Sequence, residues 1–231
     1  MSAVKALYAV STNRQLTFDQ KVAAFLKIGI EKLNLETAIV SRVTDYTYTI
    51  AHAVSPNPDI AVGAQFSLAE TYCVDALKAG DVLTYHNINV HPGAEHPCYD
   101  KYPMRSYISL PLQVNGETYG TLNFSSLEPR DAPFSDEEVD YVYCVAGWIS
   151  TTLSKHEQIA ELKAQRDEIE ERNVLLNQIA ELAGIGTWEL DIASQALEWS
   201  GKLKSIFGLD ENASVSIDSV VAFIRRPEEK R

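Results

Sequence analysis

Apolar residues recur at intervals of three or four between Phe18 and Leu35. This spacing is typical of one face of an amphipathic helix. Thr17 stands immediately before the run and Gln20 follows three residues later, which is the arrangement of a capping box. The pattern therefore predicts a helix that begins after Thr17 and buries one face.

Two runs rich in β-branched and aromatic residues follow, ETAIVSRV and YTYTIAHAV. They predict two strands joined by a tight turn at Thr44-Asp45. The next segment, SPNPDI, is a loop because its prolines and asparagine interrupt regular structure. Residues Phe66 to Leu77 then carry apolar residues at helical spacing and predict a second helix.

Three further strand signals lie between residues 81 and 126, namely DVLTYHNI, RSYISLPLQV and ETYGTLNFSS. The last two are joined by Asn115-Gly116. An Asn-Gly pair between apolar runs strongly predicts a hairpin, because both turn positions require positive φ.

Another helix is expected after Pro133, with Ser135 as its N-cap and acidic residues in its first turn. Its apolar face comprises Val139, Val142, Val145 and Ile149, and Cys144 is expected in the core or in a dimer interface. The order helix, two strands, helix, three strands, helix predicts an α+β domain over residues 1–153. Its sheet is expected to be antiparallel, with the terminal helices together on one face.

Residues 154–182 are highly charged and contain neither glycine nor proline. Apolar residues occupy most heptad a and d positions, whereas Arg166 and Asn173 fall at a positions. A buried asparagine there fixes register and favours two strands, at some cost in stability. The apolar positions in this seam are Ile159, Leu162, Ile169, Leu176 and Ala180. We predict one nearly continuous helix from about Asp136 to Leu182 that pairs in parallel with a second copy. The alternative is a solvated linker helix with one apolar stripe.

Residues 183–231 form a third segment. TWELDI and ALEWS predict two strands, KLKSIFGL a short helix, and Asp218–Ile224 a further helical turn. About 50 residues are at the lower limit for independent folding.

The chain has 32 acidic and 20 basic residues and a formal net charge of −12. This charge disfavours binding to nucleic acid or to anionic lipid. The three cysteines form no CxxC pair, which argues against a disulfide framework or a zinc ribbon. No stretch has the roughly 18–20 apolar residues of a membrane span, and the first residues do not resemble a signal peptide. We therefore expect a cytoplasmic protein.

Functional side chains are concentrated between Thr84 and Tyr107, in a stretch rich in proline and glycine that predicts a loop. We expect the part of this loop that carries His96 and Cys98 to close over an aromatic cavity formed with other segments. The candidate ligand-binding residues are Phe66, Tyr72, Cys73, His96, Cys98, Tyr99, Tyr107 and Tyr119.

Other interpretations of this loop remain open. His91, His96 and Cys98, with Cys73, could bind zinc or iron, but their spacing matches no standard metal motif. Cys73 and Cys98 could form a thiol switch if their α-carbons approach within about 7 Å. The histidines and cysteines could instead be structural, with Pro92, Pro97 and Pro103 stiffening the loop.

Residues from about 17 to 153 resemble a GAF domain of bacterial signalling proteins, through FSLAETYC, HPCY, MRSYISLPLQVNGETYGTLNFSS and EPRDAPFSDEEVDYV. The segment GIGTWELDIASQALEWSGKLKSIFGLD resembles the N-terminal half of a PAS domain. The resemblance implies a sensor that binds a small ligand between its sheet and the overlying loops and dimerises through helices. Such modules occur in proteins of the histidine kinase or diguanylate cyclase type. The later strands of a PAS sheet are absent, so residues 183–231 form an incomplete PAS-like module. Either the chain is a fragment or its last module is degenerate. We expect a fragment whose effector domain lies beyond Arg231, with no catalytic module of its own.

The resemblance identifies neither the ligand nor a cofactor. Cys98 resembles the chromophore cysteine of photosensory GAF domains in position, but Tyr99 follows it where histidine is usual, and an Asp-Ile-Pro signature is missing. We therefore expect no bilin. The clustered cysteines of methionine sulfoxide reductases are not matched by Cys73 and Cys98. Small-molecule sensing is thus the leading function, and the alternatives are a dimerisation or docking module and a thiol redox sensor or enzyme that uses Cys73 and Cys98.

Overall fold

The computed structural model describes residues 3–91 and 95–217, in two units that divide between Gln158 and Ile159. Pro92 and the helical turn predicted at Asp218–Ile224 lie outside the described residues.

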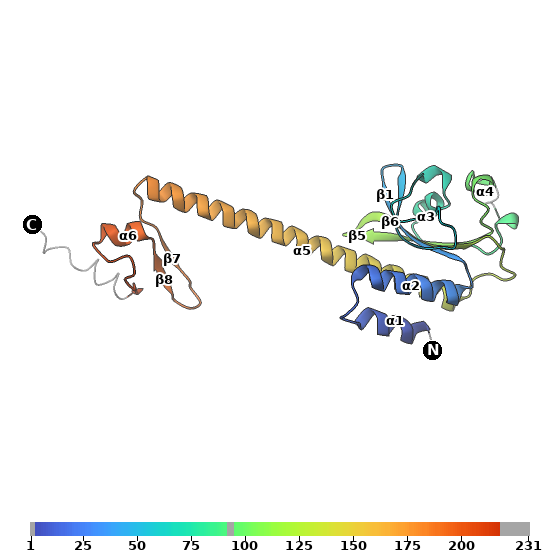
Figure 1. The fold of residues 1–231 in the computed structure, drawn as a ribbon, viewed down its shortest axis with the longest axis horizontal. Coiled ribbons are helices and arrows are strands. Elements are labelled where there is room, and N and C mark those ends of the chain that lie inside the picture. Colours follow the sequence, from blue (N-terminus) through green and yellow to red (C-terminus); the bar gives the residue numbers. More distant parts are fainter. Residues whose placement is uncertain (1–2, 92–94, 218–231) are drawn as a thin grey trace, which may run out of the picture. The chain divides into compact units, whose positions relative to one another are not determined.

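The first unit is an antiparallel sheet with helices on both faces (Figure 1). The strands lie in the order β3-β2-β1-β6-β5-β4. Their bounds are β1 (Thr37–Thr44), β2 (Thr47–Val54), β3 (Gln65–Ser67), β4 (Leu83–Tyr85), β5 (Ser106–Val114) and β6 (Glu117–Ser126). The helices are α1 (Ala3–Thr12), α2 (Phe18–Leu33), α3 (Cys73–Ala79), α4 (Cys98–Lys101) and the start of α5 (Asp136–Leu182), with 3₁₀ turns η1 (Leu68–Glu70) and η2 (Ile88–Val90). The α+β prediction is confirmed.

Two hydrophobic clusters lie on opposite faces of the sheet. The larger joins α2 and α5 to one face and includes Phe25, Leu122, Phe124 and Ile149. The smaller lies under α3, η2 and α4 on the other face and includes Tyr48, Tyr72, Cys98 and Tyr107. The first cluster builds the domain core, and the second surrounds the candidate site.

Local signals in the sequence account for several boundaries. The Thr17 side chain accepts a hydrogen bond from the Gln20 backbone, and the Gln20 side chain accepts one from the Thr17 backbone, so the predicted capping box is confirmed. Asn115 and Gly116 have φ values of 53° and 84°, which gives the predicted hairpin between β5 and β6. The turn between β1 and β2 is at Asp45 and Tyr46, one residue later than predicted.

The helix predicted for Phe66–Leu77 is wrong in its first half. Phe66 lies in β3 and pairs with Tyr48 of β2, and the chain then makes a 3₁₀ turn before α3 begins at Cys73. Short apolar runs fit helix and strand periodicity alike, and here pairing with β2 decides the outcome. The strand predicted for DVLTYHNI is also shorter than expected, because only Leu83–Tyr85 pair with β5.

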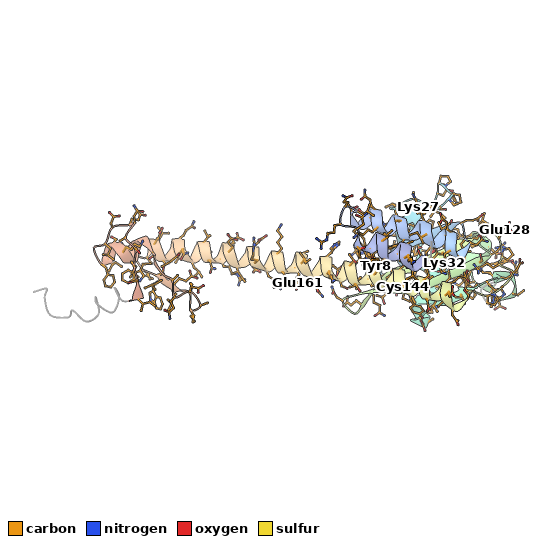
Figure 2. All side chains as sticks on the ribbon, turned by 90° about the horizontal axis from the view of Figure 1, so that it is seen from below. Tyr8, Lys27, Lys32, Glu128, Cys144 and Glu161 are labelled. Atoms are coloured by element: carbon orange, nitrogen blue, oxygen red, sulfur yellow. The ribbon has the colours of Figure 1, made fainter. Side chains whose placement is uncertain are left out.

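The helix predicted after Pro133 is present and buries the expected face. Val142, Val145 and Ile149 are at most 1% exposed. Cys144, in contrast, is exposed in the single chain (Figure 2), so the core alternative is wrong and its place in a dimer interface remains a prediction. Successive residues lie about 100° apart around a helix, so Cys144 lies beside the buried face rather than at its centre.

In the second unit, α5 continues to Leu182, and the whole helix of 47 residues has the predicted bounds. A two-stranded sheet follows, formed by β7 (Trp188–Leu190) and β8 (Leu197–Trp199), and then α6 (Gly201–Ile206). These elements fall where the strand and helix signals place them. Within the described ranges, no helix combines the length and apolar character needed to cross a membrane.

Candidate functional site

A cavity of about 490 Å³ lies on the face of the sheet opposite α2 and α5. The strands β1, β2, β3, β5 and β6 contribute to it, and η1–α3, α4 and the segment after α4 cover it. Its volume is within the usual range for small-molecule sites. The lining residues are Ile39, Tyr48, Ile50, Asn57, Asp59, Ile60, Phe66, Thr71, Tyr72, Cys73, Cys98, Lys101, Tyr102, Pro103, Met104, Tyr107, Asn123, Ser125 and Leu127.

Aromatic rings form much of the wall. The ring of Phe66 lies 5.9 Å from that of Tyr102 and 6.2 Å from that of Tyr48, both in edge-to-face geometry. The rings of Tyr72 and Tyr107 are 5.4 Å apart. These separations are those of favourable aromatic pairs, so the rings support one another as a fixed wall.

A hydrogen-bonded group of neutral side chains forms the floor. Asn123 on β6 donates through Nδ2 to the hydroxyl of Tyr48 on β2, at 3.1 Å. Thr121 donates to Cys73 Sγ at 3.3 Å, and Cys73 Sγ lies 3.2 Å from the Tyr107 hydroxyl. The network links three strands to the first residue of α3.

Burial keeps this floor uncharged. It raises the pKa values of Tyr48 and Tyr107 well above the ordinary value for tyrosine. Burial also raises the pKa of the Cys73 thiol, although hydrogen bonds from Thr121 and Tyr107 act in the opposite direction. The pKa of Cys98 rises to about 12, again chiefly because of burial. Both thiols are therefore protonated near neutral pH.

The charged lining residues lie at the mouth of the cavity. The side chains of Lys101 and Asp59 are exposed, and the Lys101 ammonium is paired with Glu70. The interior thus offers shape and neutral hydrogen-bonding groups rather than charge.

Five of the eight predicted site residues line this cavity: Phe66, Tyr72, Cys73, Cys98 and Tyr107. His96 and Tyr99 instead hold its cover together. His96 Nδ1 accepts a hydrogen bond from the Cys98 backbone at 3.1 Å, and its ring packs 5.1 Å from that of Tyr72. The Tyr99 hydroxyl donates to Asn89 at 2.8 Å, on the outer side of α4.

The prediction that Tyr119 shares this cavity is wrong. Tyr119 packs against the hydrophobic cluster on the opposite face of the sheet. The register of β5 and β6 explains its position, because Leu112 pairs with Gly120 and Gln113 with Thr118, which leaves Tyr119 as an unpaired extra residue. A bulge of this kind breaks the two-residue alternation of side chains.

Several lining residues were not among the predicted ones, most notably Tyr48, Ile50 and Asn123. Strand alternation places Tyr48 and Ile50 on one face of β2. It does not indicate which face carries the cavity, nor that β2 and β6 contribute to the same floor. Tyr102 and Met104 lie in the loop that the sequence analysis singled out.

The fold does not support the metal-binding interpretation of the loop. Among the described residues, no group of three or more His, Cys, Asp and Glu side chains is arranged to hold a metal ion. His91 pairs instead with His86, with 3.2 Å between ring nitrogens.

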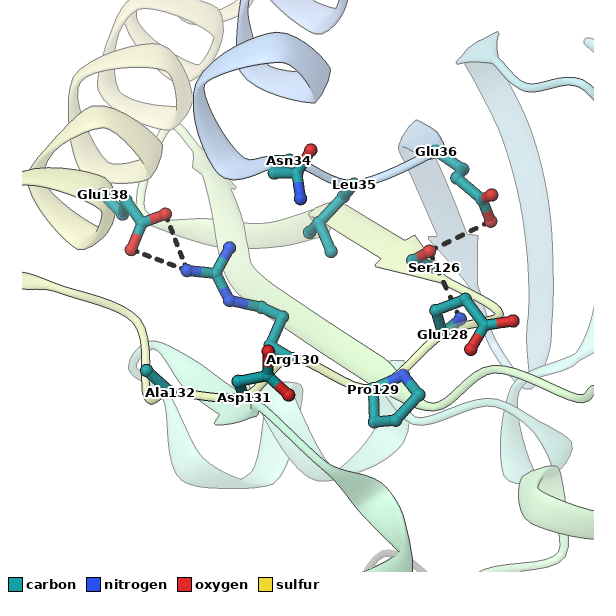
Figure 3. Close-up of a pocket in the computed structure, with 10 residues that line it drawn as sticks. All are labelled: Asn34, Leu35, Glu36, Ser126, Glu128, Pro129, Arg130, Asp131, Ala132 and Glu138. Atoms are coloured by element: carbon teal, nitrogen blue, oxygen red, sulfur yellow. Dashed lines mark hydrogen bonds and ion pairs between the residues drawn. The ribbon is translucent and has the colours of Figure 1, made fainter.

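A second hollow, of about 440 Å³, lies beside the end of α2 and the start of α5 (Figure 3). Arg130 crosses it and donates from one nitrogen to both carboxylate oxygens of Glu138, at 2.8 and 3.0 Å. Arg130 also donates to the carbonyl of Leu33. This arrangement ties the first turn of α5 to the end of α2 and to the loop after β6, so we interpret the hollow as a structural joint.

The comparison with protein families agrees with this geometry. The model of the GAF domain matches residues 14–153, which is more than half of the chain. The chain belongs to the GAF domain family. The expected boundaries of about 17–153 are thus confirmed, whereas the PAS resemblance and the paired linker helix remain predictions. GAF domains are small-molecule-sensing modules of signalling proteins.

Solved GAF structures share the fold at low sequence identity. The GAF domain of an Acinetobacter phosphoenolpyruvate-protein phosphotransferase is 10% identical, with a TM-score of 0.56, covering 70% of this chain and 98% of its own. Free methionine-R-sulfoxide reductase from Neisseria meningitidis, in complex with its substrate, is 16% identical, with a TM-score of 0.52 and coverages of 67% and 89%.

A phycocyanobilin-bound GAF domain from a cyanobacterial phytochrome is 12% identical, with a TM-score of 0.53 and coverages of 67% and 95%. No curated protein matched the chain. At these identities the structural similarity establishes the fold alone.

Proposed function

We propose that residues 14–153 form the ligand-binding sensor of a bacterial signal-transduction protein of the histidine kinase or diguanylate cyclase type. In this proposal the protein is cytoplasmic, a small molecule occupies the cavity on the α3 face, and α5 passes the signal on. The observation that carries the proposal is the cavity itself. It combines about 490 Å³ of space, an aromatic wall and a few convergent polar groups, which are the features of a small-molecule site.

The exposed stripe of α5 supports transmission through a helical dimer. Four apolar side chains at heptad spacing, Ile159, Leu162, Ile169 and Leu176, are between 60% and 65% exposed in the single chain. A second copy in parallel would cover them by knobs-into-holes packing. A ligand then acts by binding one arrangement of the dimer more tightly than the other. In this proposal the PAS-like segment and a downstream effector domain receive the signal.

We propose a binding domain rather than an enzyme. A cysteine nucleophile needs its thiolate, and burial raises the pKa values of both Cys73 and Cys98. A thiol switch remains the second candidate, because both cysteines line the same cavity. Reaction of the folded chain with a thiol reagent, followed by intact-mass analysis, distinguishes the two. Rapid modification of Cys73 or Cys98, or a disulfide between them, would favour the switch.

Native mass spectrometry and the absorbance spectrum of the purified chain test the proposal directly, because a retained ligand adds mass or colour. Met104→Trp should fill the cavity from its rim and abolish retention or binding of any ligand found. Ile28→Trp is the matched control, since Ile28 is also half-buried but packs against the other cluster. A ligand bound equally by both variants would overturn this site, and a chain that binds no small molecule would favour the docking module.

We expect no covalent bilin at Cys98. Its side chain has no exposed surface, its pKa is raised to about 12, and Tyr99 follows it. Co-expression with bilin-synthesis enzymes should therefore yield a colourless protein. A visible band, with a mass increase that is lost in Cys98→Ala, would contradict this expectation.

A further inference from the structure

The side chain of Asn123 presents an oxygen without a protein partner to the cavity. Asn123 is only 3% exposed and lies among the lining residues. Its Nδ2 faces inward, 3.1 Å from the Tyr48 hydroxyl, 3.4 Å from Thr121 Oγ1 and 3.6 Å from Cys73 Sγ. In the described part of the chain, no group donates a hydrogen bond to Oδ1.

This oxygen is not sealed by protein. The fully enclosed side-chain polar atoms without a partner, among the described residues, are Ser109 Oγ and Arg130 Nε. Asn123 Oδ1 is not one of them, and Asn123 lines the cavity, so we infer that this oxygen is open to the cavity. A nearly buried amide oxygen with no donor is unfavourable, so the geometry calls for a donor on the molecule that occupies the cavity.

No charged lining residue lies in the interior of the cavity, where it could pair with a charged ligand. Its two charged lining residues, Lys101 and Asp59, are exposed at the mouth, and Lys101 already pairs with Glu70. A carboxylate, phosphate or ammonium placed on the floor would lose its hydration without a compensating ion pair. The floor is thus matched to an uncharged group.

The wall favours a flat, apolar body. The rings of Phe66, Tyr102 and Tyr48 stand edge to face at 5.9 and 6.2 Å, beside the Tyr72–Tyr107 pair at 5.4 Å. An aromatic ring of a ligand can pack against these rings in the offset or edge-to-face geometry that stabilises aromatic pairs.

We propose that the cavity binds a neutral aromatic compound that carries one N–H or O–H group and donates it to Asn123 Oδ1. This inference rests on the proposed sensing function and adds the ligand class. Under this proposal, anionic compounds such as nucleotides and carboxylates are not the ligands of this cavity.

A matched set of probes tests the ligand class. Equilibrium binding to the whole chain is measured at neutral pH for 2-naphthol, 2-methoxynaphthalene, 2-naphthoate and 2-naphthylmethylammonium. We expect 2-naphthol to bind about tenfold tighter than the methyl ether, as one hydrogen bond predicts, and tighter than both ions. Equal binding of the ether, tighter binding of either ion, or no binding of 2-naphthol would overturn the inference.

Two variants separate the acceptor from the inner network. Asn123→Leu removes Oδ1 together with the inner hydrogen bonds of the amide. Tyr48→Phe removes the Tyr48 hydroxyl and its hydrogen bonds, including the one from Asn123, but leaves Oδ1 in place. We expect the preference for 2-naphthol over its ether to disappear in Asn123→Leu and to persist in Tyr48→Phe. Loss of the preference in both variants would show that Asn123 acts only through the fold. If Asn123→Leu does not fold, the affinity for 2-naphthol relative to its methyl ether, measured in the wild type and in Tyr48→Phe, still tests the proposed ligand class.

The two proposals fail in different ways. Suppose that the probes do not show the expected preference for 2-naphthol, but that Met104→Trp abolishes binding of a retained compound. The proposed ligand class is then wrong, whereas the proposed sensing function is supported. If the chain retains no compound and binds no probe, both fail.

Discussion

Two glycines in helix interiors, Gly29 in α2 and Gly147 in α5, have opposite surroundings. A β-carbon on Gly29 would lie 2.3 Å from Cε1 of the buried Phe124 ring, whereas one on Gly147 would meet no atom within 4 Å. Gly29 thus permits close packing of α2 on the sheet, and Gly147 serves no such purpose within the chain.

The two alanine variants should therefore change stability in opposite directions. Gly147→Ala should raise the free energy of unfolding by up to about 1 kcal/mol, because alanine is the better helix former. Gly29→Ala should lower it by about 1–3 kcal/mol through overpacking. Chemical denaturation measures both. Destabilisation by Gly147→Ala would indicate instead that a second molecule approaches α5 closely at this position.

The ion pair of Arg130 and Glu138 is nearly buried, with the two side chains 17% and 14% exposed. Burial alone would raise the pKa of Glu138, but hydrogen bonds from Ser135 and from the Arg130 guanidinium outweigh it and leave the pKa below its ordinary value of 4.5. A lowered carboxyl pKa stabilises the fold above the unfolded-state value, and this stabilisation is lost as the pH falls through the folded-state value.

We therefore expect Glu138→Gln to lower the free energy of unfolding at pH 7 by about 2 kcal/mol, as for a hydrogen bond to a charged group. The difference from wild type should shrink as the pH falls below that ordinary value. Denaturation curves across this pH range provide the measurement. Glu137→Gln is the control, because the Glu137 side chain is 91% exposed and lies 4.0 Å from Lys32. Equal effects of the two variants would contradict a special role for the Arg130 joint.

Among the elements, α5 combines two kinds of surface. Up to about residue 153 its apolar residues pack in the domain core, as Val142, Val145 and Ile149 show. Farther along, its apolar stripe is exposed, and Asn173 occupies an a position of the predicted heptads. A buried asparagine at such a position costs stability and specifies register.

Replacing Asn173 tests this assignment. Asn173→Leu should strengthen association, because it makes one of the two polar a positions of the seam apolar, while loosening register or oligomer number. Sedimentation equilibrium and disulfide trapping between introduced cysteines report the two effects. Glu171→Leu, at the outward f position, adds the same side chain outside the seam and should change neither. Equal effects of the two leucines would reject the heptad assignment.

The whole molecule is strongly acidic and exposes an apolar stripe in its second unit. Two copies that pair through this stripe would bury apolar surface, which favours association. Their like net charges would repel each other, which opposes it. The net charge of −12 is distributed over the whole chain, and repulsion between exposed charges is screened by salt. Association should therefore strengthen with ionic strength.

The wild-type chain should accordingly sediment as a dimer at tens of micromolar and shift further towards the dimer as salt is added. Analytical ultracentrifugation over a salt series makes this measurement. A monomer under all these conditions would reject the parallel dimer and the proposed route of signal transfer, while leaving ligand binding by the first unit untouched.

Interactions between near neighbours could be predicted from the sequence. The Thr17–Gln20 capping box, the Asn115-Gly116 hairpin and the bounds of α5 each depend on contacts within a few residues or on the φ preference of one position. Such signals are present in any short window of the chain. They account for most of the order of elements and, with it, for the fold class, although α1, β3 and α4 were not predicted.

Only the tertiary structure decided which side chains share the cavity. Phe66 joins the sheet because β2 is available to pair with it, and a bulge opposite Leu112 and Gln113 turns Tyr119 to the opposite face. The hydrogen bond from Asn123 to Tyr48 joins residues 75 positions apart. Register between distant strands sets these outcomes, because a shift of one residue exchanges the two faces of a strand.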